Sequence, residues 1–202
     1  MTTARAGEGQ QKESAAQSDD AQRREMQPHG RSAMVHSIAD AVVIKDEEVF
    51  FLCEQSGRVP AGGDHGLGLY YHDTRYLSGY EVSLAGRRFN SLVASSALGY
   101  KAVIELTNPE LRAGDGAEIA KDTIGVKLTR LVDHEGLAIS DVYAFENYGT
   151  ESAELPLSFT FAADFADIFE VRSLSPQPPG TAKPATWGHD ALTFAYRGKD
   201  GI

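Results

Sequence analysis

The side chains best suited to chemistry in this chain are three acids that recur at every third residue. Asp164, Asp167 and Glu170 follow directly after a strongly patterned strand segment. Such carboxylates can accept hydrogen bonds from sugar hydroxyls or help to frame an active site. Glycoside hydrolysis requires two carboxyl groups about 5–5.5 Å apart for retention, or about 6.5–9.5 Å apart for inversion. Neighbouring acids on one segment rarely reach that geometry across a substrate, so we predict no catalytic residue here.

The same spacing also has a structural interpretation. A repeat of three residues is typical of a helix or turn, so the preceding strand is expected to break into a tight turn. Asp164 would then cap the turn, and the other two acids would pair with Arg172 or face water. Both interpretations stay open from the residues alone.

A second polar cluster lies in the segment from Gly66 to Leu77. Tyr71 could stack on a ligand while Asp73 and Arg75 offer it polar groups. We favour a structural role, in which Asp73 caps a short turn and Arg75 pairs with a neighbouring acid. The Gly-x-Gly pattern is not a dinucleotide loop, because no strand and helix flank it in the required order.

Other reactive or ligating side chains give weaker signals. Asp64, His65, His72 and Asp73 lie in or beside a Gly-rich loop without a paired histidine, so we predict no metal site. Cys53 is the only cysteine, which excludes an internal disulfide, and no histidine lies near it in sequence to form a nucleophile pair. No cofactor is predicted.

The charge distribution excludes one large class of partner. The net charge is −10, and the first 33 residues carry equal numbers of acids and bases, so the excess of acid lies in residues 34–202. An acidic surface without a basic stripe repels phosphate, and nucleic acid is therefore not an expected partner. The charge does not exclude neutral sugars as ligands. No targeting or membrane-spanning signal is present, so we expect a cytoplasmic protein that does not bind membranes.

The elements that position these residues are expected to be short antiparallel strands. No amphipathic helix of three turns is evident in residues 34–202. Alternating or β-branched runs separated by turns indicate an all-β sandwich. The expected strands are residues 41–45, 48–53, 80–84, 89–93, 101–106, 124–133, 137–145, 154–161 and 191–196.

The strongest strand pattern precedes the three acids. Leu155, Leu157, Phe159 and Phe161 alternate with polar residues and are expected on one face of a sheet. Pro156 has no N–H to donate, which predicts a position at a sheet edge or a strand start.

The chain divides into a tail and one domain. Residues 1–33 lack branched aliphatic and aromatic side chains, which predicts a disordered tail. Residues 34–202 form the expected sandwich, with a Pro-rich loop at 173–190 under which Trp187 is expected to pack. The alternative for Trp187 is an exposed indole that stacks on the face of a sugar. Because the sequence stops just after a turn signature, we expect a domain that is truncated at its C-terminus. Leu155, Phe159 and the last strand would then lack part of their cover, and solubility would be poor.

Four blocks of the sequence resemble a known family. They are Gly68-Leu-Tyr-Tyr-His-Asp-Thr-Arg-Tyr-Leu-Ser78, Leu106-Thr-Asn-Pro109, Glu146-Asn-Tyr-Gly149 and Ala163-Asp-Phe-Ala-Asp-Ile-Phe-Glu-Val-Arg172. Together they resemble the N-terminal domain of bacterial glycogen-debranching enzymes of the amylo-α-1,6-glucosidase type. The resemblance extends from about Val35 to Arg172 and includes the final segment Tyr196-Arg-Gly-Lys-Asp-Gly201. His72 stands where an arginine is more usual, and Ser173 where glycine is common.

The resemblance implies a division of labour between two domains. It implies a β-sandwich, of the super-sandwich type, followed by a helical (α/α) barrel that carries the hydrolytic carboxylates. The chain itself would then be a non-catalytic part of a glycoside hydrolase, with the barrel as its partner. An α-glucan would be a candidate ligand. The residues expected at the domain interface or the wall of the sugar cleft are Tyr71, Asp73, Arg75, Asp164, Asp167 and Glu170. The alternatives are a stand-alone carbohydrate-binding module and a protein-interaction sandwich.

Overall fold

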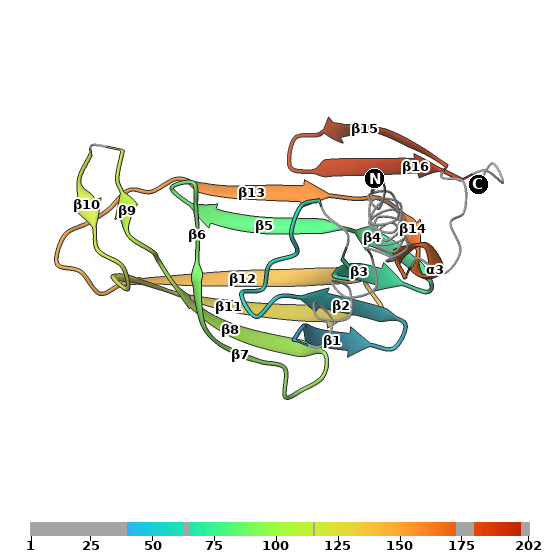
Figure 1. Cartoon of the computed structure of the whole chain (residues 1–202), viewed down its shortest axis with the longest axis horizontal. Coiled ribbons are helices and arrows are strands. Elements are labelled where there is room, and N and C mark those ends of the chain that lie inside the picture. Colours follow the sequence, from blue (N-terminus) through green and yellow to red (C-terminus); the bar gives the residue numbers. More distant parts are fainter. Residues whose placement is uncertain (1–39, 63–64, 115, 173–179, 199–202) are drawn as a thin grey trace, which may run out of the picture. The chain divides into compact units, whose positions relative to one another are not determined.

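The described part of the protein is built almost entirely from antiparallel strands (Figure 1). A computed structural model describes residues 40–62, 65–114, 116–172 and 180–198. The predicted disordered tail lies outside these residues. Within them, no helix has the length and apolar character needed to cross a membrane.

One sheet has five strands and carries the Gly68–Leu77 segment. Its strand order is β1-β2-β3-β4-β14, and all its neighbours are antiparallel. The strands are β1 (Val42–Asp46), β2 (Val49–Cys53), β3 (Gly68–Tyr71), β4 (Thr74–Leu77) and β14 (Ala166–Asp167).

A second sheet has four strands, and a third has three. The four-stranded sheet has the order β12 (Ala138–Asn147), β11 (Ile124–Asp133), β8 (Lys101–Thr107), β7 (Asn90–Ser95). The three-stranded sheet has the order β13 (Leu157–Ala162), β5 (Gly79–Leu84), β6 (Arg87–Arg88). Strands β11 and β12 pair along their full length of ten residues, and β11 has the alternation of buried and less buried residues that its sequence predicts.

Two hairpins and one short helix complete the described fold. The hairpins pair β9 (Leu111–Arg112) with β10 (Glu118–Ile119) and β15 (Thr181–Trp187) with β16 (Leu192–Arg197). Helix α3 (Ile168–Val171) follows β14 directly.

The hydrophobic core lies between the sheets. Ile44 and Phe51 come from the five-stranded sheet, Ile104 and Leu128 from the four-stranded sheet, and Leu84 from the three-stranded sheet, all of them buried. Burying an aliphatic or aromatic side chain of this size contributes roughly 1.5–3 kcal/mol. The structure therefore confirms the predicted antiparallel β-sandwich.

Strand β13 is the edge strand of its sheet, as Pro156 predicts. Among the strands that the structure describes, it pairs with β5 alone. It begins at Leu157, and the carbonyl of Pro156 accepts a hydrogen bond from the N–H of Ala85. Phe159 and Phe161 of this strand are 48% and 37% exposed.

The prediction of a Pro-rich loop through residue 190 is wrong for residues 181–187, which form β15. Pro184 is tolerated because β15 has only one neighbour and its pairing is interrupted by an irregularity between Lys183 and Thr186. The packed position expected for Trp187 is also wrong, because its side chain is 80% exposed. Residues 173–179 lie outside the described part.

Candidate functional site

The two polar motifs of the sequence meet at one corner of the five-stranded sheet. Strand β14 pairs with β4, which places Ala166 opposite Arg75 and Asp167 opposite Thr74. The N–H of Ile168 donates to the backbone carbonyl of Asp73 at 2.7 Å. We call the segments Gly68–Leu77 and Ala162–Arg172 together the motif corner.

Arg75 is the charged centre of the motif corner. It is 8% exposed and makes a two-pronged ion pair with Asp164, through Nε at 3.2 Å and through Nη2. Nη1 donates to the carbonyls of His65 and Leu67. Burial disfavours the guanidinium charge, but the hydrogen bond and negative charge of Asp164 outweigh it and raise the pKa of Arg75. Arg75 does pair with an acid, but with one 89 residues away in sequence.

The three acids of the second motif bind backbone groups of their own segment. Asp164 accepts from the N–H of Ala166 at 3.4 Å. Asp167 accepts from the N–H of Phe169 at 2.7 Å, and Glu170 accepts from the N–H of Asp167 at 3.0 Å, which closes a capping box on α3. Asp164 therefore holds the predicted turn. The expectation that the other two acids pair with Arg172 or face water is wrong, because they cap the helix.

The turn at Phe165 joins the motif corner to the last hairpin. Phe165 has φ +54°, a left-handed conformation that is uncommon for a bulky residue. Its ring contacts the edge of Tyr76 at a centroid distance of 5.9 Å and stacks on Tyr196 of β16 at 5.3 Å. The backbone turn thus places one aromatic side chain between β4 and β16.

The surface of the motif corner carries exposed aromatic and polar groups. Tyr76 is 43% and Phe169 is 52% exposed. Tyr71 is half-buried, and its ring centroid lies 4.1 Å from that of His72, whose exposed Nδ1 lies 3.1 Å from a carboxylate oxygen of Glu48. The corner therefore offers an apolar surface beside polar groups.

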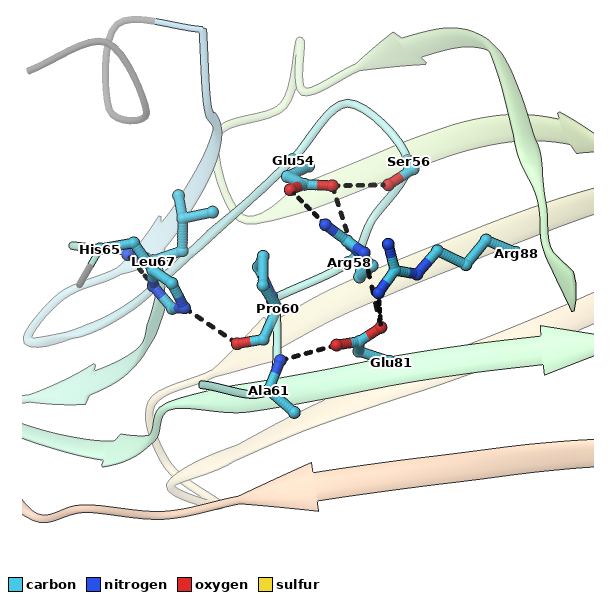
Figure 2. Close-up of polar contacts among 9 residues, drawn as sticks. All are labelled: Glu54, Ser56, Arg58, Pro60, Ala61, His65, Leu67, Glu81 and Arg88. Carbon is cyan, nitrogen blue, oxygen red and sulfur yellow. Dashed lines mark hydrogen bonds and ion pairs between the residues drawn. The ribbon is translucent and has the colours of Figure 1, made fainter. Parts of the chain in front are cut away.

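A charged network that sequence reasoning missed fixes the loop before β3 (Figure 2). Arg58 makes two hydrogen bonds to Glu54, at 3.0 and 2.8 Å, and a longer contact of 3.5 Å to Glu81. Glu81 also pairs with Arg88 and accepts from the N–H of Ala61. The hydrogen bond from Arg58 to Glu54 raises the pKa of Arg58.

The same loop delivers backbone acceptors to the motif corner. Figure 2 shows His65 beside Pro60, whose carbonyl lies 2.9 Å from Nε2 of the histidine. The N–H of Leu67 lies 3.2 Å from Nδ1 of His65. These contacts fix the two carbonyls to which Arg75 donates, so His65 has a structural role here. Asp64, the other loop residue considered as a metal ligand, lies outside the described residues.

A second buried ion pair ties the three larger sheets together. Arg130 is fully buried and binds both carboxylate oxygens of Asp141, at 2.8 and 2.6 Å. It also donates to the carbonyl of Gly57 at 2.7 Å and lies over the rings of Phe51 and Tyr80. Arg130 thus contacts all three sheets and the loop.

The buried thiol near this ion pair is poorly suited to nucleophilic chemistry. Burial raises the pKa of Cys53 to about 11, despite the opposing charge of Arg130. The nucleophile is the thiolate, and at neutral pH almost none is present. The thiol instead lies within the core cluster, 1% exposed.

The raised pKa values of the tyrosines around Asp141 predict that the domain loses stability in alkali. Burial raises the pKa of Tyr143 to about 12, and the charge of Asp141 adds to the effect; burial and the same charge also raise the pKa of Tyr80. The unfolded chain loses these protons from about pH 10, so the stability from both tyrosines is complete below about pH 10. The part from Tyr143 is lost as the pH rises through about 12, and the part from Tyr80 continues to fall above that pH.

Urea denaturation at a series of pH values measures this effect. The midpoint should fall as the pH rises above about 10, and more gradually in the variant Tyr143→Phe. A wild-type midpoint that stays constant between about pH 9 and 12 would contradict the burial of these phenols.

The geometry shows which structural class the protein belongs to. It is an antiparallel β-sandwich in which an acidic motif and a buried arginine build one corner of a sheet. Residues 44–202 match the family described as the N-terminal domain of (some) glycogen debranching enzymes, and the chain belongs to that family. The match confirms the resemblance seen in the four sequence blocks. No curated protein and no solved structure matches the chain.

Proposed function

We propose that this domain is the non-catalytic N-terminal sandwich of a glycogen-debranching glycoside hydrolase of the amylo-α-1,6-glucosidase type. Its role is to support a helical-barrel catalytic domain, which carries the carboxylates that hydrolyse the α-glucosidic branch. Family membership over residues 44–202 supports the parent activity. A cytoplasmic location is part of the proposal, because a framework with one buried cysteine requires no oxidising compartment.

The observation that supports a non-catalytic role is that the three acids of the second motif are bound to other groups of the domain. Asp164 is bound by buried Arg75, and Asp167 and Glu170 accept backbone N–H groups at the start of α3. A general acid or base must have its carboxyl group free to reach the substrate, whereas these three carboxylates are bound to groups of the domain itself. These acids therefore fit the role of scaffold better than the role of acid–base pair.

The motif corner is the surface that we assign to the partner domain or to the wall of its sugar cleft. Phe169 and Tyr76 are its exposed aromatic groups, and Tyr71 and Asp73 lie with Tyr76 on the β3–β4 hairpin of the same corner. Interfaces bury aromatic anchors of this kind and surround them with polar groups. The rigid ion pair beneath fixes their positions before the partner arrives.

Sedimentation of this chain mixed with a helical-barrel domain tests the proposal. The barrel domain is taken from a glycogen-debranching enzyme of the same organism and produced separately. We expect a one-to-one complex, which Phe169→Asp weakens by about tenfold or more. Leu98→Asp is the matched control, because Leu98 is 60% exposed and lies in the turn between β7 and β8.

Two results would contradict the assignment. Absence of any complex with the wild-type chain would remove the supporting role. Equal weakening by Phe169→Asp and Leu98→Asp would show that the motif corner is not the contact surface.

A further inference from the structure

The tip of the β15–β16 hairpin presents an aromatic side chain to solvent. Trp187 ends β15 opposite Leu192, and a tight turn closes after it with a 2.7 Å hydrogen bond from the N–H of Gly188 to the carbonyl of Ala191. Trp187 is 80% exposed. Tryptophan is highly buried on average, so an indole held open on an ordered hairpin requires an explanation.

A concave site of about 480 Å³ lies beneath this indole. Leu77 of β4 and Phe161 of β13 line it from one side, and Trp187, Leu192 and Phe194 line it from the hairpin. Figure 1 shows the hairpin next to β13. The volume falls within the range of small-molecule sites, about 300–1,000 Å³.

The rim of this site adds polar groups to the apolar lining. His189 and Asp190 both line the site, and Nδ1 of the imidazole lies 2.7 Å from the carboxylate. Their side chains are 95% and 87% exposed, so both can still bind a ligand. An aromatic face beside donors and acceptors matches a pyranose ring, which has apolar C–H faces and hydroxyl groups around its edge.

The hairpin is held in place by the motif corner. Tyr196 of β16 stacks on Phe165, which lies next to Asp164, and its hydroxyl accepts from the N–H of Gly180. A binding residue on a hairpin needs such an anchor, because an unfixed indole would lose conformational freedom on binding. The ion pair of Arg75 with Asp164 thus supports the hairpin indirectly.

Charge and surface composition favour a neutral sugar over other occupants. The net charge of −10 disfavours an anion. Strand β15 exposes all seven of its residues, and among them Trp187 is the one large apolar side chain, beside the small or cyclic residues Ala182, Pro184 and Ala185 and the polar residues Thr181, Lys183 and Thr186. Protein-docking surfaces present larger contiguous apolar patches. The indole is the single aromatic group on the mixed surface of this strand.

We propose that Trp187, with His189 and Asp190, forms a binding subsite for a linear α-glucan chain on this domain. The identity of the sugar rests on the proposed function, while the site itself rests on the exposed indole and the concave surface beneath it. The subsite would hold a branch or main chain while the partner domain hydrolyses the branch point.

Intrinsic fluorescence reads the site directly, because Trp187 is the only tryptophan in the chain. Titration with maltoheptaose should shift its emission to shorter wavelength in a saturable way and protect it from acrylamide quenching. Cellopentaose, which is β-linked, should have a much weaker effect. No saturable change with maltoheptaose would overturn the subsite.

Calorimetric titration of variants distinguishes stacking on Trp187 from other causes of maltoheptaose binding. Trp187→Ala should weaken maltoheptaose binding by about tenfold or more, and Trp187→Phe should weaken it less. Tyr148→Ala is the matched control, since Tyr148 is also an aromatic side chain, 65% exposed, and it should bind as the wild type does. Retained binding in Trp187→Ala with an unchanged melting temperature would overturn the subsite.

A final titration distinguishes this inference from the proposed function. If the emission of Trp187 responds to the helical-barrel domain and not to maltoheptaose, the hairpin is a protein contact. That outcome overturns the subsite but supports the proposed function. If maltoheptaose shifts the emission and no complex forms with the barrel, the subsite holds and the supporting role fails.

Discussion

Replacing Arg130 with alanine is expected to unfold the domain or to lower its free energy of unfolding by about 3–5 kcal/mol. The substitution leaves the carboxylate of Asp141 in the interior without its cation, together with the buried carbonyl of Gly57. It also removes the guanidinium from the rings of Phe51 and Tyr80. A loss of this size approaches the whole stability of a typical domain, roughly 5–15 kcal/mol.

Urea denaturation followed by circular dichroism measures this effect. The matched control is Arg112→Ala, because Arg112 makes an ion pair of 2.7 Å with Glu118 in which both side chains are well exposed. That variant should lose less than about 1 kcal/mol. Similar midpoints for Arg130→Ala and the wild type would show that the buried pair does not hold the sheets together.

Replacing Gly68 with alanine is expected to lower the free energy of unfolding by about 3 kcal/mol or more. Gly68 has φ +142°, which side-chain-bearing residues rarely adopt, and an added Cβ would lie 2.2 Å from the backbone oxygen of Leu77. It would also lie 2.9 Å from Cδ of Arg75. The strand pair β3–β4 must therefore separate, and Arg75 must move away from Asp164.

The variant Gly86→Ala isolates the part of this effect that comes from the backbone. Gly86 has φ +71°, and no atom lies within 4 Å of an added Cβ. It should lose only about 1–2 kcal/mol, the cost of a left-handed conformation. Equal losses for the two variants in urea denaturation would contradict the close approach at Gly68.

The strands could be predicted where side chains alternate over a long segment. The period-two pattern of residues 124–133 gives β11 its bounds, and the same period places Arg130 on the inward face with Leu128 and Val132. The positive charge obscured that position, because a buried arginine is expected only where an acid is at hand. The acid, Asp141, lies on the paired strand β12, and sequence alone does not give its register.

The motif corner was harder to predict because its central contact is not local. Arg75 and Asp164 meet only because β14 pairs with β4. The spacing of Asp167 and Glu170, in contrast, did contain a recognisable signal, since an N-cap residue followed three positions later by glutamate is typical of a capping box.

Trp187 was misplaced because the prolines before it were interpreted as a loop. Proline disfavours a central strand but not an edge strand with an irregularity, and β15 is such a strand around Pro184. The sequence left an exposed, sugar-stacking indole as the alternative, and the structure supports that exposure and adds the neighbours of Trp187 on the hairpin.

The most direct test of the central claim is the release of sugar from a branched α-glucan. We compare this chain alone, the helical-barrel domain alone, and the two together. We expect no turnover by the chain alone and a higher rate for the mixture than for the barrel alone. Hydrolysis of branch linkages by the chain alone, abolished by Asp167→Asn or Glu170→Gln in a folded protein, would contradict the claim that these acids only hold the fold.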